Sequence, residues 1–385
     1  MEKLVTSEVK LGIIAGGQLG KMLVLAASNW NVKTYVLDKD DHCPASSSCT
    51  YFFKGDQLNY DDVYRFGQLV DVLTLELENV NIDALKKLKL EGKRIYPDPD
   101  KLEIIQDKGL QKQFYEKIKV PSSSFSLLGS KQEIISAFES GRLTIPFVQK
   151  LRKGGYDGKG VSIIRSKDDL NNLLDGASVV EDIVDVNKEI SAIVARNERR
   201  EVKCHPTVEM EFNSQENLVE KLICPSTLPG EIENEAEDMA IKIITELNLY
   251  GLLAVEMFVD KNNKIWVNEI APRPHNSGHH TIESAITSQF EQLLRAIFNL
   301  PLGSTKLKMP AVMINLLGEP GYEGKVRYEG LSECMEIEGV KIHLYGKKTT
   351  KPFRKMGHVT ILAPTVDEAK SKADFVKQKL KVVSW

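Results

Sequence analysis

The sequence has little of what would mark a specialised class of protein. Its five cysteines among 385 residues are odd in number and lack CxxC spacing, which favours reduced thiols over disulfides or a structural zinc site. No apolar run approaches the roughly 20 residues of a membrane span, and the longest, residues 22–27, has six. Residues 1–10 are mixed and charged, without the apolar core of a signal peptide. We therefore expect a cytoplasmic protein without a membrane partner.

An excess of charge of one sign is also missing. The 51 Lys and Arg against 54 Asp and Glu leave a net charge of −3, which argues against non-specific binding of nucleic acid. A hydrophobic content of 42% and a charged content of 27% are ordinary for a globular protein. At roughly 150 residues per domain, the length predicts two or three domains.

Strand and helix patterns alternate in the first hundred residues. Apolar or β-rich runs at 11–15, 32–37 and 70–75 alternate with helical patterns, which predicts a small parallel sheet with crossover helices. The proline-containing turn at 96–100 and the segment 300–303 are candidate boundaries. They divide the chain into residues 1–98, 99–299 and 300–385, the last being β-rich with a helix near its end.

A first glycine turn, with Gly16, Gly17 and Gly20, follows a strand and opens a helix. This context suits an anion at a helix N-terminus, and Asp38 ends the next strand, where a dinucleotide fold places its ribose-binding acid. The dinucleotide fingerprint, however, needs glycine where this chain has Ala15. Three interpretations of this turn therefore remain, in order of preference: it binds a substrate phosphate, it is a tight turn without a ligand, or it binds a nicotinamide dinucleotide.

A second glycine loop, residues 154–160, lies between two β-rich runs and so differs from the strand-to-helix P-loop. Four glycines in seven positions are poorly suited to a rigid turn but well suited to a loop that closes over phosphates. Lys159 in the loop and Lys150 on the preceding strand supply cations. The alternative interpretation is an ordinary flexible surface loop.

Two glutamates interrupt a pair of apolar strands, residues 252–259 and 265–270. A two-residue turn at Asn262 and Asn263 would pair Val259 with Trp266, Phe258 with Val267 and Glu256 with Glu269. Directly opposed carboxylates repel, and a divalent cation such as Mg²⁺ removes that penalty. A longer turn would shift the register, and Asn268 could share the metal face only if its strand were bulged or ending there. The alternative is a solvent-exposed face that carries two glutamates.

An irregular segment rich in cations and imidazoles, residues 271–280, follows Glu269 immediately. Two prolines and a glycine rule out regular structure, so the segment should display Arg273, His275, Asn276 and Ser277 beside the predicted metal. Anion or substrate contacts are the preferred interpretation. A zinc site formed by the histidines at 275, 279 and 280, or a capped loop leading into a helix, are the alternatives. A second basic group lies at residues 345–348 and 354–358.

These motifs together resemble the ATP-grasp superfamily. Within it the chain is similar to the family of 5-(carboxyamino)imidazole ribonucleotide synthases, the ATP-dependent carboxylases of bacterial and fungal purine biosynthesis. The resemblance covers nearly the whole chain and rests on Asp-Lys at 107–108, the glycine loop, the glutamate pair and the motifs at 16–20, 75–79, 268–279 and 354–358. It implies an α/β architecture: a Rossmann-like N-terminal domain, a central ATP-grasp domain of two subdomains, and a small β-rich C-terminal domain.

The resemblance also implies a role for individual residues. The implied ATP site comprises Lys108, Lys150, Gly154, Gly155, Tyr156, Gly158, Gly160, Glu181, Asp182, Ile183, Val184, Glu189 and Asn268. The implied metal ligands are Glu256 and Glu269, and the implied catalytic residues are Asp157, Lys159, Arg273 and His275. The implied ribonucleotide site comprises Gly17, Gln18, Leu19, Glu76, Asp157, Arg273, His275, Asn276, Ser277, Lys347, Arg354 and Lys355.

The reaction that the resemblance implies consumes ATP and bicarbonate. Bicarbonate attacks the γ-phosphate to give carboxyphosphate, and 5-aminoimidazole ribonucleotide then takes the carboxyl group, directly or through CO₂, in purine biosynthesis. Mg²⁺ is the implied cofactor, with two ions expected beside the nucleotide, and a homodimer is the implied assembly. Either His275 or Asp157 could accept the amine proton.

Three positions depart from the family pattern. Phe212 falls where many members carry a histidine near the nucleotide, and Lys351 and Phe353 replace a frequent arginine and glycine. A phenyl ring cannot replace the hydrogen bonding of an imidazole. Three other functions stay open: another ATP-grasp ligase such as a formate-using glycinamide ribonucleotide transformylase, a non-catalytic nucleotide sensor, and a nicotinamide dehydrogenase.

Overall fold

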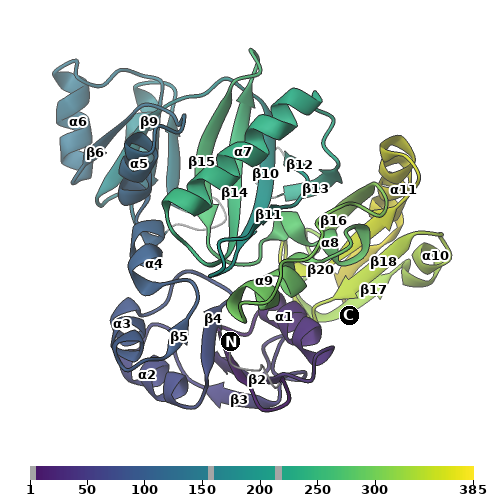
Figure 1. Ribbon diagram of the computed structural model, residues 1–385. Helices are drawn as coiled ribbons and strands as arrows, with labels where there is room; N and C mark the ends of the chain where they lie inside the picture. The colour runs from purple at the N-terminus through teal and green to yellow at the C-terminus, as the bar shows by residue number, and fades with distance from the viewer. Residues whose placement is uncertain (1–5, 155–159, 213–218) are drawn as a thin grey trace.

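A computed structural model describes residues 6–154, 160–212 and 219–385. The chain forms four sheets with helices packed against them (Figure 1). A five-stranded sheet at the bottom of the view carries the N-terminal third. A small sheet at the upper left and a large sheet in the centre stand above it, and the C-terminal elements extend to the right. Within the described ranges, no helix is long and apolar enough to cross a membrane.

The N-terminal sheet is parallel, with strand order β3-β2-β1-β4-β5. Its strands are β1 (Lys10–Ile14), β2 (Lys33–Asp38), β3 (Tyr51–Lys54), β4 (Val72–Leu75) and β5 (Arg94–Ile95). Its crossover helices are α1 (Gln18–Ser28), α2 (Tyr60–Gln68) and α3 (Ile82–Leu90). The predicted parallel sheet with crossover helices is confirmed. A parallel arrangement brings the ends of β1 and β4 to one edge, where the first glycine turn and the 75–79 motif meet.

The small sheet is antiparallel, with strand order β6-β9-β7-β8. Its elements are β6 (Phe125–Leu128), α6 (Lys131–Glu139), β7 (Phe147–Leu151), β8 (Val161–Ile164), a 3₁₀ turn (Asp168–Asn172) and β9 (Ser178–Asp182). Two helices, α4 (Pro99–Gln106) and α5 (Lys108–Lys117), connect it to the N-terminal sheet. The proline-containing turn at 96–100 also starts a helix. Pro99 occupies the first turn of α4, where its missing N–H removes no helical hydrogen bond, and Asp98 caps the helix.

The large sheet has nine strands. Those that precede residue 300 are β10 (Val186–Arg196), β11 (Val202–Cys204), β12 (Val208–Phe212), β13 (Val219–Cys224), β14 (Gly251–Asp260) and β15 (Ile265–Ala271). The helices of this region are α7 (Gly230–Glu246), α8 (Thr281–Ser284) and α9 (Gln289–Ile297), with a 3₁₀ turn at Asn276–Gly278. The apolar face of α7 packs on β10 and β14 through Ile243 and Ile244, both fully buried. The sheet therefore has a covered face, and its other face is available to the small sheet.

The C-terminal strands extend the same large sheet. β16 pairs with β13 and then with β20, which pairs with β18. A three-stranded sheet, β19-β17-β21, and two helices complete this region. Its elements are β16 (Ala311–Leu317), β17 (Gly324–Glu329), α10 (Leu331–Met335), β18 (Val340–Leu344), β19 (Thr349–Thr350), β20 (Lys355–Leu362), α11 (Val366–Lys379) and β21 (Lys381–Ser384).

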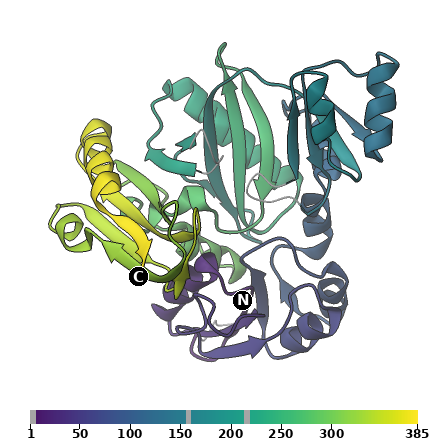
Figure 2. The same cartoon turned by 180° about the vertical axis from the view of Figure 1, so that it is seen from behind.

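One hydrophobic core joins the N-terminal sheet to the large sheet. Met22 and Leu23 of α1 belong to the same buried cluster as Phe290 and Leu294 of α9. Tyr345, from the C-terminal region, joins this cluster as well. Figure 2 shows from behind how the N-terminal and C-terminal regions meet below the large sheet. Because interiors are close-packed, this shared core fixes the edges of both sheets relative to each other.

His205 is a buried histidine, 1% exposed, and neither nitrogen of its ring has a hydrogen-bond partner in the described part of the chain. Burial lowers its pKa from 6.5 to about 4. As the pH falls from 6.5 to 4, this histidine is protonated in the unfolded chain but stays neutral in the folded chain. The difference lowers the free energy of unfolding by about 3 kcal/mol at pH 4 and below. When urea unfolding is measured at pH 7.5 and at pH 4.5, the free energy of unfolding should fall between the two pH values. This fall should be about 2–3 kcal/mol smaller in His205→Leu than in the wild type. Parallel pH profiles would contradict this expectation.

Candidate active site

The paired glutamates lie opposite each other on the hairpin β14–β15. Glu256 pairs with Glu269, as predicted, but the rest of the predicted register is wrong: Phe258 pairs with Trp266 and Val259 with Ile265. The turn is longer than two residues, since the Asp260 amide bonds the Lys264 carbonyl and Asn263 adopts a φ of 63°. A residue in this left-handed region is typical of three-residue hairpin loops.

A bulge at Asn268 restores the glutamate pairing. The register shifts between Glu256 and Met257, so that Val267 pairs with Met257 and Asn268 is the extra residue. The amide oxygen of Asn268 accepts a hydrogen bond of 2.8 Å from Lys150 Nζ, across from the small sheet. The longer turn and the bulge therefore cancel, and the bulge directs Asn268 to the same side as the glutamates.

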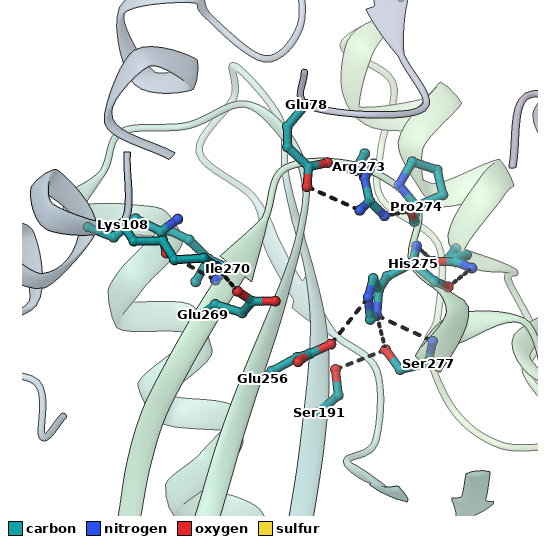
Figure 3. A network of polar contacts seen from close by, with 12 residues as sticks. Glu78, Lys108, Ser191, Glu256, Glu269, Ile270, Arg273, Pro274, His275 and Ser277 are labelled. Atoms are coloured by element: carbon teal, nitrogen blue, oxygen red, sulfur yellow. Dashed lines mark hydrogen bonds and ion pairs between the residues drawn. The ribbon is translucent and has the colours of Figure 1, made fainter. Parts of the chain in front are cut away.

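The carboxylate pair carries an electrostatic strain that a cation relieves. Burial, the neighbouring Glu269 and Glu189 together raise the pKa of Glu256 to about 8. Glu189 lies on the same sheet face, on the neighbouring strand β10, and burial raises its pKa to about 7 although Lys150 opposes the shift. Lys108, the first residue of α5, pairs with Glu269 (Figure 3). Burial alone would lower the pKa of Lys108, but Glu269 raises it.

The small sheet presents a buried network of lysines and a carboxylate toward this hairpin. Glu181 of β9 contacts Lys150 at 3.0 Å and Lys112 at 3.7 Å, and accepts a hydrogen bond of 2.9 Å from Ser123. Burial opposes its charge, but the two lysines lower the pKa of Glu181 overall. Lys112 is only 2% exposed, and burial lowers its pKa to about 8. The carboxylate of Glu181 thus holds Lys150 in place.

The three residues after Glu181 lie at the end of β9. Asp182 is exposed and its amide bonds the Ser124 carbonyl. Ile183 is 37% exposed and Val184 is half-buried. An exposed apolar side chain at the end of a strand offers a surface against which a flat ring can pack.

Arg273 and His275 extend from the irregular segment after β15. Arg273 holds Glu78 with two hydrogen bonds, of 2.6 Å from Nε and 3.3 Å from Nη2. His275 Nε2 lies 3.2 Å from Glu256, and its Nδ1 lies 2.9 Å from Ser277 Oγ, which contacts Ser191 (Figure 3). The segment after β15 therefore contacts Glu78 of the N-terminal region through Arg273 and Glu256 of the hairpin through His275.

The charge state of His275 follows from these contacts. Burial, with Arg273 and Lys355 adding to it, lowers the pKa of His275 to about 3, so the ring is neutral at pH 7. The Ser277 amide donates to Nδ1, at 3.3 Å, so Nε2 carries the proton and donates to Glu256. Both ring nitrogens are engaged, which makes His275 a weak proton acceptor in this arrangement.

A zinc site has no support in the described ranges, where no three His, Cys, Asp or Glu side chains gather as metal ligands. His279 packs against His358 with the two rings tilted by 34° and their centroids 4.7 Å apart, and His280 hydrogen-bonds Ser284. Asn276, the remaining polar residue of the segment, has a buried side-chain nitrogen without a partner among the described residues.

The first glycine turn already holds an anion of the protein itself. The Glu76 carboxylate accepts hydrogen bonds from the amides of Gly20, at 2.6 Å, and Gly17 at the start of α1. A phosphate at those amides would have to displace Glu76. Asp38 accepts a 2.7 Å bond from the Gly16 amide, and Ala15 adopts a φ of 69°, as a glycine would. Leu19 follows within α1, packed against the shared core.

The C-terminal cations Lys347 and Arg354 precede β20, and Lys355 is its first residue. Lys347 Nζ donates to Gln18 at 3.3 Å and to the Lys355 carbonyl at 2.7 Å, which ties the C-terminal region to the first glycine turn. Arg354 instead bonds the Thr349 carbonyl at 2.9 Å. It borders a hollow of about 440 Å³ lined by Glu323, Gly324, Thr349, Thr350, Lys351 and Arg354.

The departures from the family pattern have visible structural consequences. Phe353 adopts a φ of 63°, a left-handed conformation that favours the glycine of other members. Lys351 borders the hollow beside Arg354. Phe212 ends the described part of β12 and packs against the cluster that contains Met210.

Part of the glycine loop lies outside the described residues: Gly155, Tyr156, Asp157, Gly158 and Lys159. Gly154 and Gly160, which flank this segment, adopt φ values of 81° and 80°. The loop begins three positions after Leu151, the last residue of β7, and Gly160 directly precedes Val161, the first residue of β8.

Sequence reasoning missed several residues that the site uses, among them Glu78, Lys112, Ser191 and Gln289. Glu78 stands in the quoted 75–79 motif, two residues after Glu76. Lys112 is one helical turn after Lys108, a spacing that places both on one face of α5. Gln289, whose side chain bonds the backbone of His275, lies on a separate helix without a local signal.

This fold and site define an ATP-grasp enzyme of the ligase class. The ATP-grasp domain family matches residues 113–290, the ribonucleotide synthetase preATP-grasp domain residues 9–106, and the phosphoribosylaminoimidazole carboxylase C-terminal domain residues 311–372. The chain belongs to the N5-carboxyaminoimidazole ribonucleotide synthase family, as predicted. It is 35% identical over 362 residues to the synthase of Bacillus subtilis, which covers 93% of this chain and 92% of that protein.

Longer proteins and solved structures are similar too. The chain is 36% identical over 373 residues to a chloroplastic phosphoribosylaminoimidazole carboxylase of Vigna aconitifolia. The match spans 94% of this chain and 66% of that protein. The synthetase of Thermotoga maritima shares 42% identity and a TM-score of 0.90, covering 98% of this chain and 100% of that one. The Aspergillus clavatus synthase, in complex with ADP and 5-aminoimidazole ribonucleotide, shares 30% identity and a TM-score of 0.88 over 97% of this chain and 99% of that one.

Proposed function

We propose that this protein carboxylates 5-aminoimidazole ribonucleotide to 5-carboxyaminoimidazole ribonucleotide, using ATP and bicarbonate, in purine biosynthesis. The observation that carries the proposal is the junction at which a carboxylate pair, Lys150 of the small sheet, Lys108 of α5 and Arg273 meet, in a chain of this family. A carboxylate pair flanked by cations suits phosphoryl transfer. The proposed domains are residues 1–98, 99–299 and 300–385.

In the proposed ATP site, the lysines hold the phosphates and the end of β9 holds the adenine. Lys150 is fixed by Glu181 and Asn268, so its ammonium is already oriented before the nucleotide binds. Glu189, on the face of β10 next to the hairpin, binds the ribose. The remaining proposed contacts come from Lys108, Asn268, residues 181–184 and the glycine loop at 154–160.

Glu256 and Glu269 fit a divalent cation. Their mutual repulsion and burial raise the pKa of Glu256 to about 8, a penalty that a cation removes. Both offer the hard oxygen ligands that Mg²⁺ prefers, and nucleotide phosphates complete its shell. Bound there with the nucleotide, Mg²⁺ would neutralise charge on the transferring phosphoryl group.

The proposed reaction begins when bicarbonate attacks the γ-phosphate of ATP to give carboxyphosphate and ADP. Arg273, whose fork is held by Glu78, stabilises the carbonate oxygens. Lys150 and Lys159 stabilise the phosphoryl charge, and closure of the glycine loop excludes water from the labile intermediate. The amine of the ribonucleotide then attacks the carboxyl carbon of carboxyphosphate, or of CO₂ released from it; inorganic phosphate leaves and the amine gives up a proton.

The neutral, doubly engaged His275 favours Asp157 as the acceptor of the amine proton. His275 instead orients Glu256. The proposed ribonucleotide site comprises Gly17, Gln18, Leu19, Glu76, Asp157, Arg273, His275, Asn276, Ser277, Lys347, Arg354 and Lys355. The contact between Lys347 and Gln18 supports a phosphate site between the first and last domains.

We also propose a homodimer located in the cytoplasm. Both properties follow from the family resemblance. Size-exclusion chromatography with light scattering tests the first, since a homodimer doubles the mass of one 385-residue chain.

One assay tests the proposed function: ADP formation with Mg²⁺, ATP and bicarbonate, measured with and without 5-aminoimidazole ribonucleotide. We expect the ribonucleotide to raise the rate several-fold, and EDTA to abolish it. Glycinamide ribonucleotide with formate should give no stimulation, which separates this function from that of a formate-using ligase. Absence of stimulation by 5-aminoimidazole ribonucleotide would overturn the proposal.

A further inference from the structure

Arg152, a residue without an assigned role, joins the end of β7 to the start of α5. It follows Leu151, the last residue of β7, and one residue separates it from the glycine loop. Its carbonyl accepts a 2.9 Å hydrogen bond from the Lys108 amide. Its guanidinium grips Asp107 with two bonds of 2.8 Å, from Nε to Oδ1 and from Nη2 to Oδ2. Backbone and side chain thus bind two consecutive residues.

Asp107 is itself the N-cap of α5. Its Oδ1 accepts the amides of Gly109, at 2.8 Å, and Leu110, at 3.2 Å, and the residue is 5% exposed. Arg152 lowers the pKa of Asp107 against the opposing effect of burial. One carboxylate therefore holds the first turn of the helix and the guanidinium together.

The helix is shaped to admit this guanidinium. A Cβ added at Gly109 would lie 2.7 Å from Arg152 Nε and 3.1 Å from its Cζ, closer than real contacts allow. Gly109 sits within the helix at an ordinary helical position, where alanine would be the better helix former. The glycine thus makes room for Arg152 at the expense of helix propensity.

Lys108 lies between these contacts. It is the first residue of α5, directly after Asp107, and its ammonium reaches Glu269 of the hairpin. The direction of its side chain depends on the position of the helix start, which Arg152 fixes relative to β7. We propose that Arg152 is a positioning residue that holds Lys108 in place for nucleotide binding, an inference that rests on the proposed role of Lys108 at ATP.

Binding of ADP, followed by calorimetry, tests this inference without bicarbonate or ribonucleotide. Arg152→Gln should weaken ADP about tenfold, the size expected for loss of a charge-assisted fork. In a Lys108→Gln background, the same change should have less than a twofold effect, because the residue through which Arg152 acts is gone. Arg142→Gln, on the same subdomain, is the control and should leave ADP affinity unchanged, since the side chain of Arg142 is held by an exposed hydrogen bond to Ser140.

Two further variants separate positioning from a general structural role. Arg152→Lys keeps the charge but not the fork, and should not restore affinity. Gly109→Ala should weaken ADP similarly although it favours the helix, and it serves if Arg152→Gln does not fold. Wild-type ADP affinity in Gly109→Ala or Arg152→Gln, or an equal loss in the Lys108→Gln background, would overturn the inference. If ADP binds as expected but the ribonucleotide does not stimulate turnover, the proposed function fails and this inference stands.

Discussion

Glu269→Gln is expected to lower turnover by roughly a thousandfold while the protein stays folded. The expected loss combines removal of a proposed metal ligand with a changed electrostatic environment for the phosphoryl group, and one preorganised stabiliser alone is worth about 10²–10³ in kcat. Glutamine has the same shape as glutamate. It also relieves the repulsion on Glu256, whose pKa Glu269 helps to raise, so the change should not unfold the hairpin.

The measurement is the steady-state rate of ADP formation, paired with thermal unfolding of the same preparation. Glu211→Gln is a suitable control, because Glu211 lies on the same large sheet but its side chain is 45% exposed. That variant should keep the wild-type rate. A rate for Glu269→Gln within tenfold of the wild type would refute the metal role of the pair.

The sequence predicted this pair correctly through a partly wrong argument. Alternation of apolar residues was enough to predict both strands, but not the length of the turn between them. The actual loop shifts the register by one, and the bulge at Asn268 shifts it back before Glu269. A bulge depends on what its side chain reaches across space, here Lys150 from the small sheet, and strand periodicity carries no information about that contact.

Contacts between residues far apart in the chain were what sequence reasoning could not find. Glu78 meets Arg273 across 195 positions, and Lys108 meets Glu269 across 161. The family motifs supplied Arg273, Lys108 and Glu269, each by local pattern. Their mutual contacts arise from the packing of α1 against α9 and of α5 beside the hairpin, and such packing has no local signature.

Arg273→Lys is expected to lower kcat/KM for bicarbonate roughly 100-fold. Lysine keeps the positive charge but cannot reproduce the planar fork that holds Glu78 and faces the site. Arg273 is the residue proposed to stabilise the carbonate oxygens, so the loss should fall on bicarbonate use. The affinity for ADP should change by less than about twofold, since Lys108 and Lys150 are the residues proposed to hold the phosphates.

The matched control is another arginine with the same kind of grip. Arg295 on α9 holds Glu291 through Nε at 2.8 Å and Nη2 at 2.7 Å, and its side chain is 30% exposed. Arg295→Lys loses two bonds to a single oxygen of Glu291 within one helix. An i,i+4 pair of this kind contributes about 0.3–0.5 kcal/mol, so the rate of this variant should stay within twofold of the wild type. If Arg273→Lys behaves like Arg295→Lys, then Arg273 serves only to tie Glu78 to the irregular segment. A selective loss of bicarbonate use instead separates its chemical role from the structural contact that both arginines share.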